Sequence, residues 1–216
     1  MLPFTIDQFL SVFAAYNHAI WPAQIVAYLV GALAVGLVFA RTTCSDRAIA
    51  VILASMWLWT GIAYHGLFFS AISKPAFLFG ALFVLQGLYF AFEGGVRARV
   101  AYSARTDLSG WIGYAFIAYA LVIYPLLGMV TGHAWPAMPM FGVTPYPVTI
   151  FTFGILLLAT GYSRRLLVIP VIWSLIGGSA ASLLGIQQDW LLLASGVISI
   201  IVLALRKTTS PDGRGT

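Results

Sequence analysis

Histidine, tyrosine and tryptophan are the residue types that bring hydrogen-bonding chemistry into the apolar stretches of this chain. His65 directly follows Tyr64 within one such stretch, while His18 and His133 stand beside others. An ionisable side chain is costly inside a lipid bilayer, so each of these positions is a candidate functional site. A hydrogen bond to a neighbouring helix is the simpler role for His65, and interfacial solvation is the simpler role for His18 and His133.

The three histidines, taken with Asp189, have the ligand chemistry that a zinc-like ion prefers. No two of the histidines are three or four residues apart, so no pair shares one helical face. The spacing therefore does not indicate a metal site, and we predict no metal or other cofactor. A membrane enzyme or metal-binding protein that uses His18, His65 and His133 is kept as an alternative.

A central cavity between the two halves of a helix bundle, towards its outer side, is the arrangement that would use most of these residues. The run Gly177-Gly178-Ser179-Ala180-Ala181 either faces bulky side chains or lets two helices pack closely. In the first case, Tyr64 and His65 would lie opposite this run. The predicted substrate-binding residues are Trp59, Tyr64, His65, Trp173 and Ser179, with Gln24 and Gln86 as polar supports.

Three further residues are candidates for gating or coupling. Glu93 lies near the end of an apolar stretch, where it could couple a proton, reach the interface or pair with Arg97 or Arg99. Pro125 and Pro170 are predicted to kink their helices, because a proline inside a helix removes a backbone hydrogen bond. Hinges of this kind would serve a protein that opens alternately to two sides of a membrane.

Seven apolar stretches must position these residues. The chain has 216 residues, of which 61% are hydrophobic and 8% charged, and its mean hydropathy is +0.97. Soluble domains carry about 25% charged residues, so this composition cannot cover a water-facing surface. A spanning helix needs about 20 apolar residues. We predict an all-α polytopic membrane protein whose single domain covers 1–206, followed by a disordered cytoplasmic tail at 207–216. The seven predicted transmembrane helices are 20–40, 48–72, 75–92, 111–131, 148–162, 166–185 and 190–205.

Basic residues are distributed unequally between the two sides of this predicted bundle. Ten of the 11 Lys and Arg residues fall in alternate connections or in the tail, and Lys74 alone falls on the other side. Short connections rich in Lys and Arg stay in the cytoplasm. We therefore predict an external N-terminus and a cytoplasmic C-terminus.

A short amphipathic helix is predicted before the first span, over residues 5–17. Thr5 and Gln8 fit a capping box, in which each side chain satisfies an unpaired backbone donor at the helix start. Apolar residues recur at helical spacing opposite Asp7 and Ser11. A helix of this kind is expected to lie flat on the outer interface. The proline-rich segment 132–147 is expected to form either a lid or a rigid connector.

Seven helices divide as three, one and three, and an internal repeat is one explanation of this arrangement. An offset of 114 residues aligns Trp59-Thr60-Gly61-Ile62 with Trp173-Ser174-Leu175-Ile176. The two tryptophans would then be equivalent walls of the cavity. Apolar helices also match by chance, so a parallel duplication is one of two interpretations.

Several classes of protein are disfavoured by what the sequence contains. The net charge of +5 is explained by the basic connections, and no dense basic run indicates nucleic-acid binding. Cys44 is the single cysteine, so no disulfide forms within the chain. A retinal protein needs a lysine in its last helix, and 190–205 has none. Ser179 and His65 could be drawn as a protease dyad, but no motif requires it.

Three segments carry a resemblance to a known family: 57–65 (WLWTGIAYH), 79–86 (FGALFVLQ) and 141–154 (FGVTPYPVTIFTFG). The chain resembles a bacterial multi-pass integral membrane family of unknown function over nearly its whole length. The resemblance implies a location in the bacterial inner membrane and no particular activity. The arrangement of helices alone is similar to that of SWEET-type sugar transporters, whose halves are parallel repeats.

The leading functional hypothesis is a transporter or permease for a small neutral or weakly polar solute, with its cavity between the two three-helix halves. The first alternative is a non-transporting membrane subunit that binds lipid or a partner protein. The second alternative is the histidine-based enzyme or metal-binding protein described above. The expected partners are the lipid bilayer, the solute, and a second copy of the chain or another membrane protein; nucleic acid is not expected.

Overall fold

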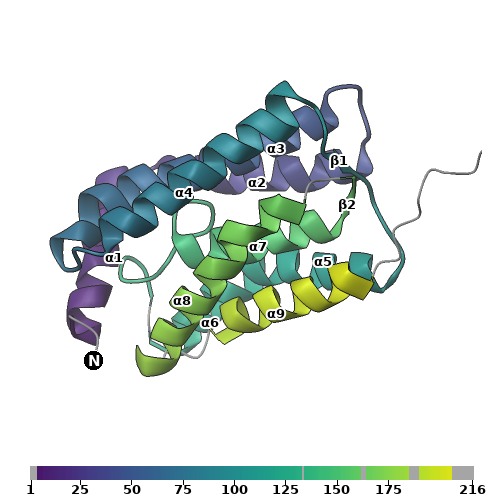
Figure 1. Cartoon of the computed structure of the whole chain (residues 1–216). Helices are drawn as coiled ribbons and strands as arrows, with labels where there is room; N and C mark the ends of the chain where they lie inside the picture. The colour runs from purple at the N-terminus through teal and green to yellow at the C-terminus, as the bar shows by residue number, and fades with distance from the viewer. Residues whose placement is uncertain (1–3, 133, 162–163, 185–189, 206–216) are drawn as a thin grey trace, which may run out of the picture.

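The computed structural model describes residues 4–132, 134–161, 164–184 and 190–205, and most of these residues are helical (Figure 1). The prediction of an all-α fold is confirmed, with one addition: the short strands β1 (Ala101–Tyr102) and β2 (Ala159–Gly161) pair antiparallel. The other elements, in chain order, are α1 (Ile6–Ile20), α2 (Ala23–Phe39), α3 (Ser45–Trp59), η1 (Thr60–Phe68), η2 (Phe69–Ala71), α4 (Ala76–Phe90), η3 (Ala91–Val96), α5 (Leu108–Ala118), η4 (Tyr119–Ile123), α6 (Tyr124–Val130), α7 (Pro145–Leu157), η5 (Arg164–Leu167), α8 (Val168–Leu184) and α9 (Trp190–Leu205).

Three continuous helical segments are long and apolar enough to cross a membrane: Ser45–Ala71, Ala76–Val96 and Leu108–Val130. A fourth candidate is the pair α1 and α2, which are bent by 86° relative to each other. Each of the seven predicted stretches overlaps a helix, but α7 and α9 are shorter apolar helices. At 1.5 Å per residue, the 13 residues of α7 extend about 20 Å, less than the roughly 30 Å of a bilayer core.

The α7 helix lies at the centre of the molecule, with α2, α3 and α4 on one side and α5, α6 and α9 on the other (Figure 1). Every residue of α7 is buried. A helix that is apolar on all faces is expected in such a central position. The indole nitrogen of Trp57 on α3 donates to Thr152 Oγ1 on α7 at 2.8 Å, which joins the first layer to the centre.

The N-terminal helix forms where the sequence predicts it. Thr5 and Gln8 make the reciprocal bonds of a capping box, and the buried face of α1 carries Phe9, Phe13 and Tyr16. Asn17, at the end of this face, donates through Nδ2 to two backbone carbonyls of the 132–147 segment, each at 2.7 Å. That segment therefore packs onto α1 as a connector, which favours the connector over the lid.

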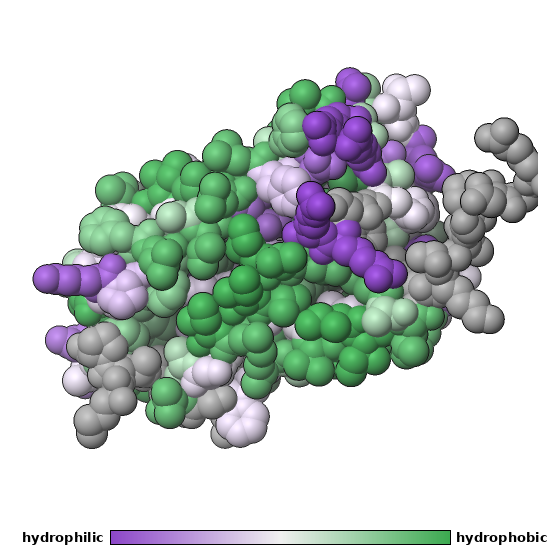
Figure 2. Space-filling view, in the orientation of Figure 1, coloured by the Kyte–Doolittle hydropathy of each residue, from purple (hydrophilic) through white to green (hydrophobic). Residues whose placement is uncertain are grey.

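Hydrophilic residues gather at the two ends of the molecule, and hydrophobic surface covers the region between them (Figure 2). We call the end that holds β1 and β2 the basic end. Three contacts join different elements there: Tyr102 N donates to Asp46 Oδ1 at 2.8 Å, Ala101 pairs with Gly161, and the Phe39 and Tyr114 rings stack. The described basic residues of this end are Arg41, Arg47, Arg97, Arg99, Arg105, Arg164 and Arg165.

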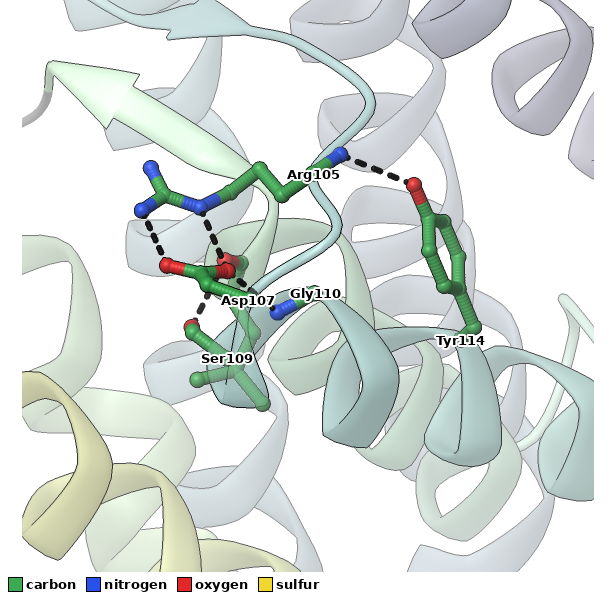
Figure 3. A network of polar contacts seen from close by, with 6 residues as sticks. Arg105, Asp107, Ser109, Gly110 and Tyr114 are labelled. Atoms are coloured by element: carbon green, nitrogen blue, oxygen red, sulfur yellow. Dashed lines mark hydrogen bonds and ion pairs between the residues drawn. The ribbon is translucent and has the colours of Figure 1, made fainter.

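The start of α5 at the basic end is held by a polar network (Figure 3). Asp107 caps α5 by accepting from Gly110 N at 3.0 Å, and its two oxygens pair with Arg105 at 3.1 and 2.5 Å. Arg105 N donates to the Tyr114 hydroxyl at 2.9 Å. The hydrogen bond and charge of Asp107 raise the pKa of Arg105. Ser109 donates to the Leu157 carbonyl at 3.0 Å, so the network also fixes the end of α7.

An aromatic cavity around His65 as the candidate functional site

A cavity of about 400 Å³ lies at the opposite end of the molecule, which we call the cavity end. It is bounded by α1, η1, η2, α4, α7 and α8, so elements from both of the predicted three-helix halves contribute to it. Most of its lining is aromatic or aliphatic, and none of the described residues that line it is an acid, a lysine or an arginine. The lining residues are Phe4, Phe9, Tyr64, His65, Phe69, Ser73, Pro75, Phe79, Pro145, Tyr146, Trp173, Ile176, Gly177, Ser179, Ala180 and Leu183.

His65 lies in η1, a nine-residue π-helix that continues α3. Wide π-helical turns are uncommon and often occur at functional sites. Two glycines let η1 and α4 approach each other here. A Cβ added to Gly80 would lie 2.9 Å from the Gly61 carbonyl oxygen and 3.3 Å from His65 Cβ. The close approach of η1 and α4 therefore depends on the absence of a side chain at position 80.

Aromatic rings surround the His65 imidazole. Its centroid lies 4.9 Å from that of Phe83 and 5.1 Å from that of Trp173, and Phe83 and Trp173 are themselves 5.1 Å apart. These three rings form a closed triangle at the base of the cavity. Trp57 stacks on Phe83 at 4.4 Å, further towards the core, so the aromatic packing continues below the triangle.

The polar atoms of this triangle are buried and unsatisfied. Neither nitrogen of His65, nor Nε1 of Trp173, has a hydrogen-bond partner among the described residues. His65 is fully buried, and Trp173 is 4% exposed. Leaving a buried polar group without a partner costs about 1–3 kcal/mol. The arrangement is therefore suited to a bound molecule that supplies hydrogen-bonding groups to these two side chains.

The α8 wall is built from small residues. Gly177 leaves room for the Tyr146 ring, because a Cβ at this position would lie 2.8 Å from Tyr146 Cε1. The Tyr146 ring stacks on that of Trp173, with centroids 6.1 Å apart. Ser179 lines the cavity, although its hydroxyl donates at 2.7 Å to the Leu175 carbonyl of its own helix.

Four of the predicted binding residues thus meet at one cavity, namely Tyr64, His65, Trp173 and Ser179. The expected placement of Tyr64 and His65 opposite the small-residue run of α8 is also seen, through Gly177, Ser179 and Ala180.

The other three predicted residues lie elsewhere. Trp59 is 41% exposed and donates to the Tyr16 hydroxyl at 2.8 Å, beside a separate groove between α2 and α3. It is therefore not the second wall of the cavity. Gln24 donates to the Asn17 carbonyl at 2.9 Å, and Gln86 donates to the Leu166 carbonyl at 3.0 Å. Both glutamines are buried supports between segments, away from the cavity lining.

The gating candidates also lie away from the cavity. Glu93, mostly buried in η3, pairs with Arg97 at 3.2 Å at the basic end. Pro170 is in the first turn of α8, directly after the 3-10 helix η5, so it lies where two helical segments join and not in the interior of one. Pro125 follows the π-helix η4 at the start of α6, within one continuous segment. We attribute the wider turns of η4 to this proline.

The histidines do not come together in the part of the chain that the structure describes. His18 is exposed and its ring lies 5.9 Å from that of Trp135, whereas the ring neighbours of His65 are those given above. His133 and Asp189 lie outside the described residues. Among the residues that were placed, no group of three His, Cys, Asp or Glu side chains could hold a metal ion.

Several residues of the cavity were missed by the sequence analysis, including Phe4, Phe9, Phe69, Phe79 and Tyr146. The apolar face of α1 was assigned to the membrane surface, but Phe9 packs against Phe69 with centroids 6.0 Å apart. The helical spacing of that face was the available signal. It specifies that a face is buried, and it does not specify what covers it.

A family model for a family of unknown function (DUF6064) matches residues 6–212, so the chain belongs to that family. No curated protein and no solved structure matches the chain. The resemblance to a family of unknown function is thereby confirmed, while its bacterial, multi-pass character and the similarity to SWEET-type transporters stay predictions.

Proposed function

We propose that this member of the DUF6064 family is a bacterial inner-membrane protein that binds a small, uncharged, weakly polar molecule in the cavity around His65. In this proposal the chain crosses the membrane seven times, the basic end faces the cytoplasm, and the cavity end faces outwards. The observation that carries the proposal is the pair of buried, unpartnered side chains, His65 and Trp173, in a cavity lined by rings.

The absence of charge among the described lining residues supports an uncharged ligand. An ion taken into such a site would lose its hydration without gaining a partner of opposite charge, at a cost of several kcal/mol. A neutral ring compound would instead replace water against aromatic walls. The volume of about 400 Å³ falls within the range of about 300–1,000 Å³ that is usual for small-molecule sites.

Transport is the first use that we propose for this site, because the cavity is formed by both three-helix halves. The π-helix η1 at the cavity supports this, since π-helical turns often occur at functional sites. The second use is retention of the ligand by a non-transporting subunit. It is favoured by the closed triangle of His65, Phe83 and Trp173, beneath which the core is filled by Trp57.

Binding can be tested by filling the cavity. Ala180, which lines it, would be replaced by Trp, and the lipid-facing Ala32 of α2 would be replaced by Trp as the matched control. A panel of uncharged compounds of about 10–20 heavy atoms would be screened by the thermal stability of the purified protein, because a ligand stabilises the state that binds it. We expect A180W to abolish the stabilisation and A32W to retain it. Equal responses of both variants would overturn the proposal.

A swelling assay in proteoliposomes distinguishes transport of the ligand from its retention. Osmotic swelling in the panel compounds that stabilise the protein would be compared between wild-type protein, A180W and liposomes without protein. Faster swelling with wild-type protein alone establishes a permease. Binding in the stability assay without faster swelling establishes the retaining role.

A further inference from the structure

We propose that the ligand is a lipid-soluble quinone-type compound, meaning a flat uncharged ring with hydrogen-bond-accepting oxygens, and that it enters from the bilayer beside α8. This inference rests on the proposed binding function and specifies the chemical class of the ligand. It concerns binding alone.

The donors at the base of the cavity select for an acceptor oxygen. The indole N–H of Trp173 can only donate, and a neutral imidazole offers one donor and one acceptor. The nitrogens of both side chains are buried behind the cavity surface, so in the proposed complex the two rings turn to present them. A ring carbonyl has two lone pairs, so it then accepts from both Trp173 and His65. The hydroxyl of the reduced ring could also donate to the remaining imidazole nitrogen. A hydrocarbon would leave all of these buried groups without partners.

The shape of the lining selects for a ring. Aromatic side chains line the cavity from six elements: Phe9 from α1, Tyr64 from η1, Phe69 from η2, Phe79 from α4, Tyr146 from α7 and Trp173 from α8. The faces and edges of aromatic rings favour stacked or edge-on contact with another flat ring. A carboxylate or phosphate headgroup would find no cation among the described lining residues.

The route of entry follows from residues that belong both to the cavity and to the outer surface. Ile176 is 38% exposed and Leu183 is 73% exposed, and both line the cavity. The neighbouring surface of α4 is also apolar, because Phe77 and Leu78 are more than half exposed. In the membrane these side chains face lipid. The cavity is therefore open to the hydrocarbon layer, where a ring with an alkyl tail dissolves.

Three probes with similar alkyl tails show how the ring, its oxygen atoms and a charged headgroup each affect binding. Decylbenzoquinone, decylbenzene and decanoic acid would be equilibrated with the full-length protein in nanodiscs, and empty nanodiscs would correct for partition into lipid. We expect saturable binding of decylbenzoquinone and at least about tenfold weaker binding of the other two. Decylbenzene offers no hydrogen-bond acceptor, and decanoate has no ring and brings a charge that no described lining residue pairs.

Two variants keep an aromatic ring and remove the polar atoms, namely Trp173→Phe and His65→Phe. Each is expected to weaken decylbenzoquinone binding about tenfold. Trp111→Phe is the matched control, because Trp111 is 65% exposed at the start of α5. Thermal unfolding shows whether each variant folds. If His65→Phe does not fold, binding to Trp173→Phe alone is the test.

The outcomes distinguish this inference from the proposed function. Equal binding of decylbenzene and decylbenzoquinone, or no effect of Trp173→Phe, overturns the quinone assignment and leaves the binding function in place. The quinone assignment is also overturned, and the binding function kept, if an uncharged compound from the thermal-stability panel binds and decylbenzoquinone does not. If no probe and no panel compound binds, both are overturned.

Discussion

The side-chain amide of Gln86 on α4 donates to the main-chain carbonyl of Leu166, 3.0 Å away, just before α8. In a regular helix this carbonyl would accept from the N–H four residues later. That residue is Pro170, which has no N–H. The proline therefore leaves an acceptor that a side chain from the other half of the molecule satisfies, and the bond links the two halves.

Replacing Gln86 with Leu should destabilise the protein by about 1–2 kcal/mol, because the buried Leu166 carbonyl loses its donor. Pro170→Ala restores a backbone N–H that can reach the same carbonyl. The double variant should therefore lose less stability than Gln86→Leu alone. Chemical unfolding in detergent measures this cycle, and strictly additive effects would contradict the explanation.

Gly80→Ala should destabilise the protein by about 1–3 kcal/mol, because the added methyl group would press on the Gly61 carbonyl and on His65. Ligand binding should weaken at the same time, since His65 would move. Gly36→Ala is the matched control, because a Cβ at this helical position meets nothing within 4 Å. That control should be neutral or stabilising by up to about 1 kcal/mol. Similar losses in both variants would contradict the packing argument.

Stability at alkaline pH should depend on Tyr102 at the basic end. Burial raises the pKa of the Tyr102 phenol in the folded protein, and the charge of Asp46 raises it further. In the unfolded chain this pKa is about 10. Above that pH the unfolded state releases a proton that the folded state retains, so the free energy of unfolding falls as pH rises.

Tyr102→Phe should remove the part of the fall in unfolding free energy at alkaline pH that is due to this phenol. That part is at most about 1.4 kcal/mol per pH unit. The measurement is the free energy of unfolding of both proteins between pH 8 and 11. Parallel curves for the two proteins would show that Tyr102 does not contribute.

The proposed topology predicts how single cysteines react. Cys44 is free and exposed at the basic end, so a membrane-impermeant maleimide should label it only after permeabilisation of spheroplasts. In a Cys44→Ser background, Lys74→Cys should be labelled without permeabilisation. The reverse pattern would place the basic end outside and overturn the orientation.

The sequence was sufficient for the features that depend on local chemistry and apolar length. The capping box of Thr5 and Gln8 forms as predicted, and the apolar stretches become helices. Tyr64 and His65 were predicted to face the small residues of α8, and they share a cavity with them. The signal was a pair of bulky side chains on one predicted helix and a run of glycine and other small residues on another.

The sequence was insufficient where helix geometry departs from the α-helix. Trp59 ends α3, and the π-helix η1 begins at the next residue. Wider turns change which residues share a face, so an angle extrapolated from Trp59 to His65 is wrong. Whereas η4 is followed by Pro125, no proline within or directly after η1 marks where its wider turns begin. The burial of α7 on all faces likewise removes the periodicity that would have indicated its neighbours.

The β1–β2 ribbon has a mechanical consequence for the whole protein. It fastens the connection after α4 to the connection after α7, at the end of the molecule opposite the cavity. The Trp57–Thr152 and Gln86–Leu166 hydrogen bonds also join these two parts of the molecule, so separating them at the cavity end would require a rotation about the ribbon. A small rotation there would be amplified along the helices into its largest displacement at the aromatic rings.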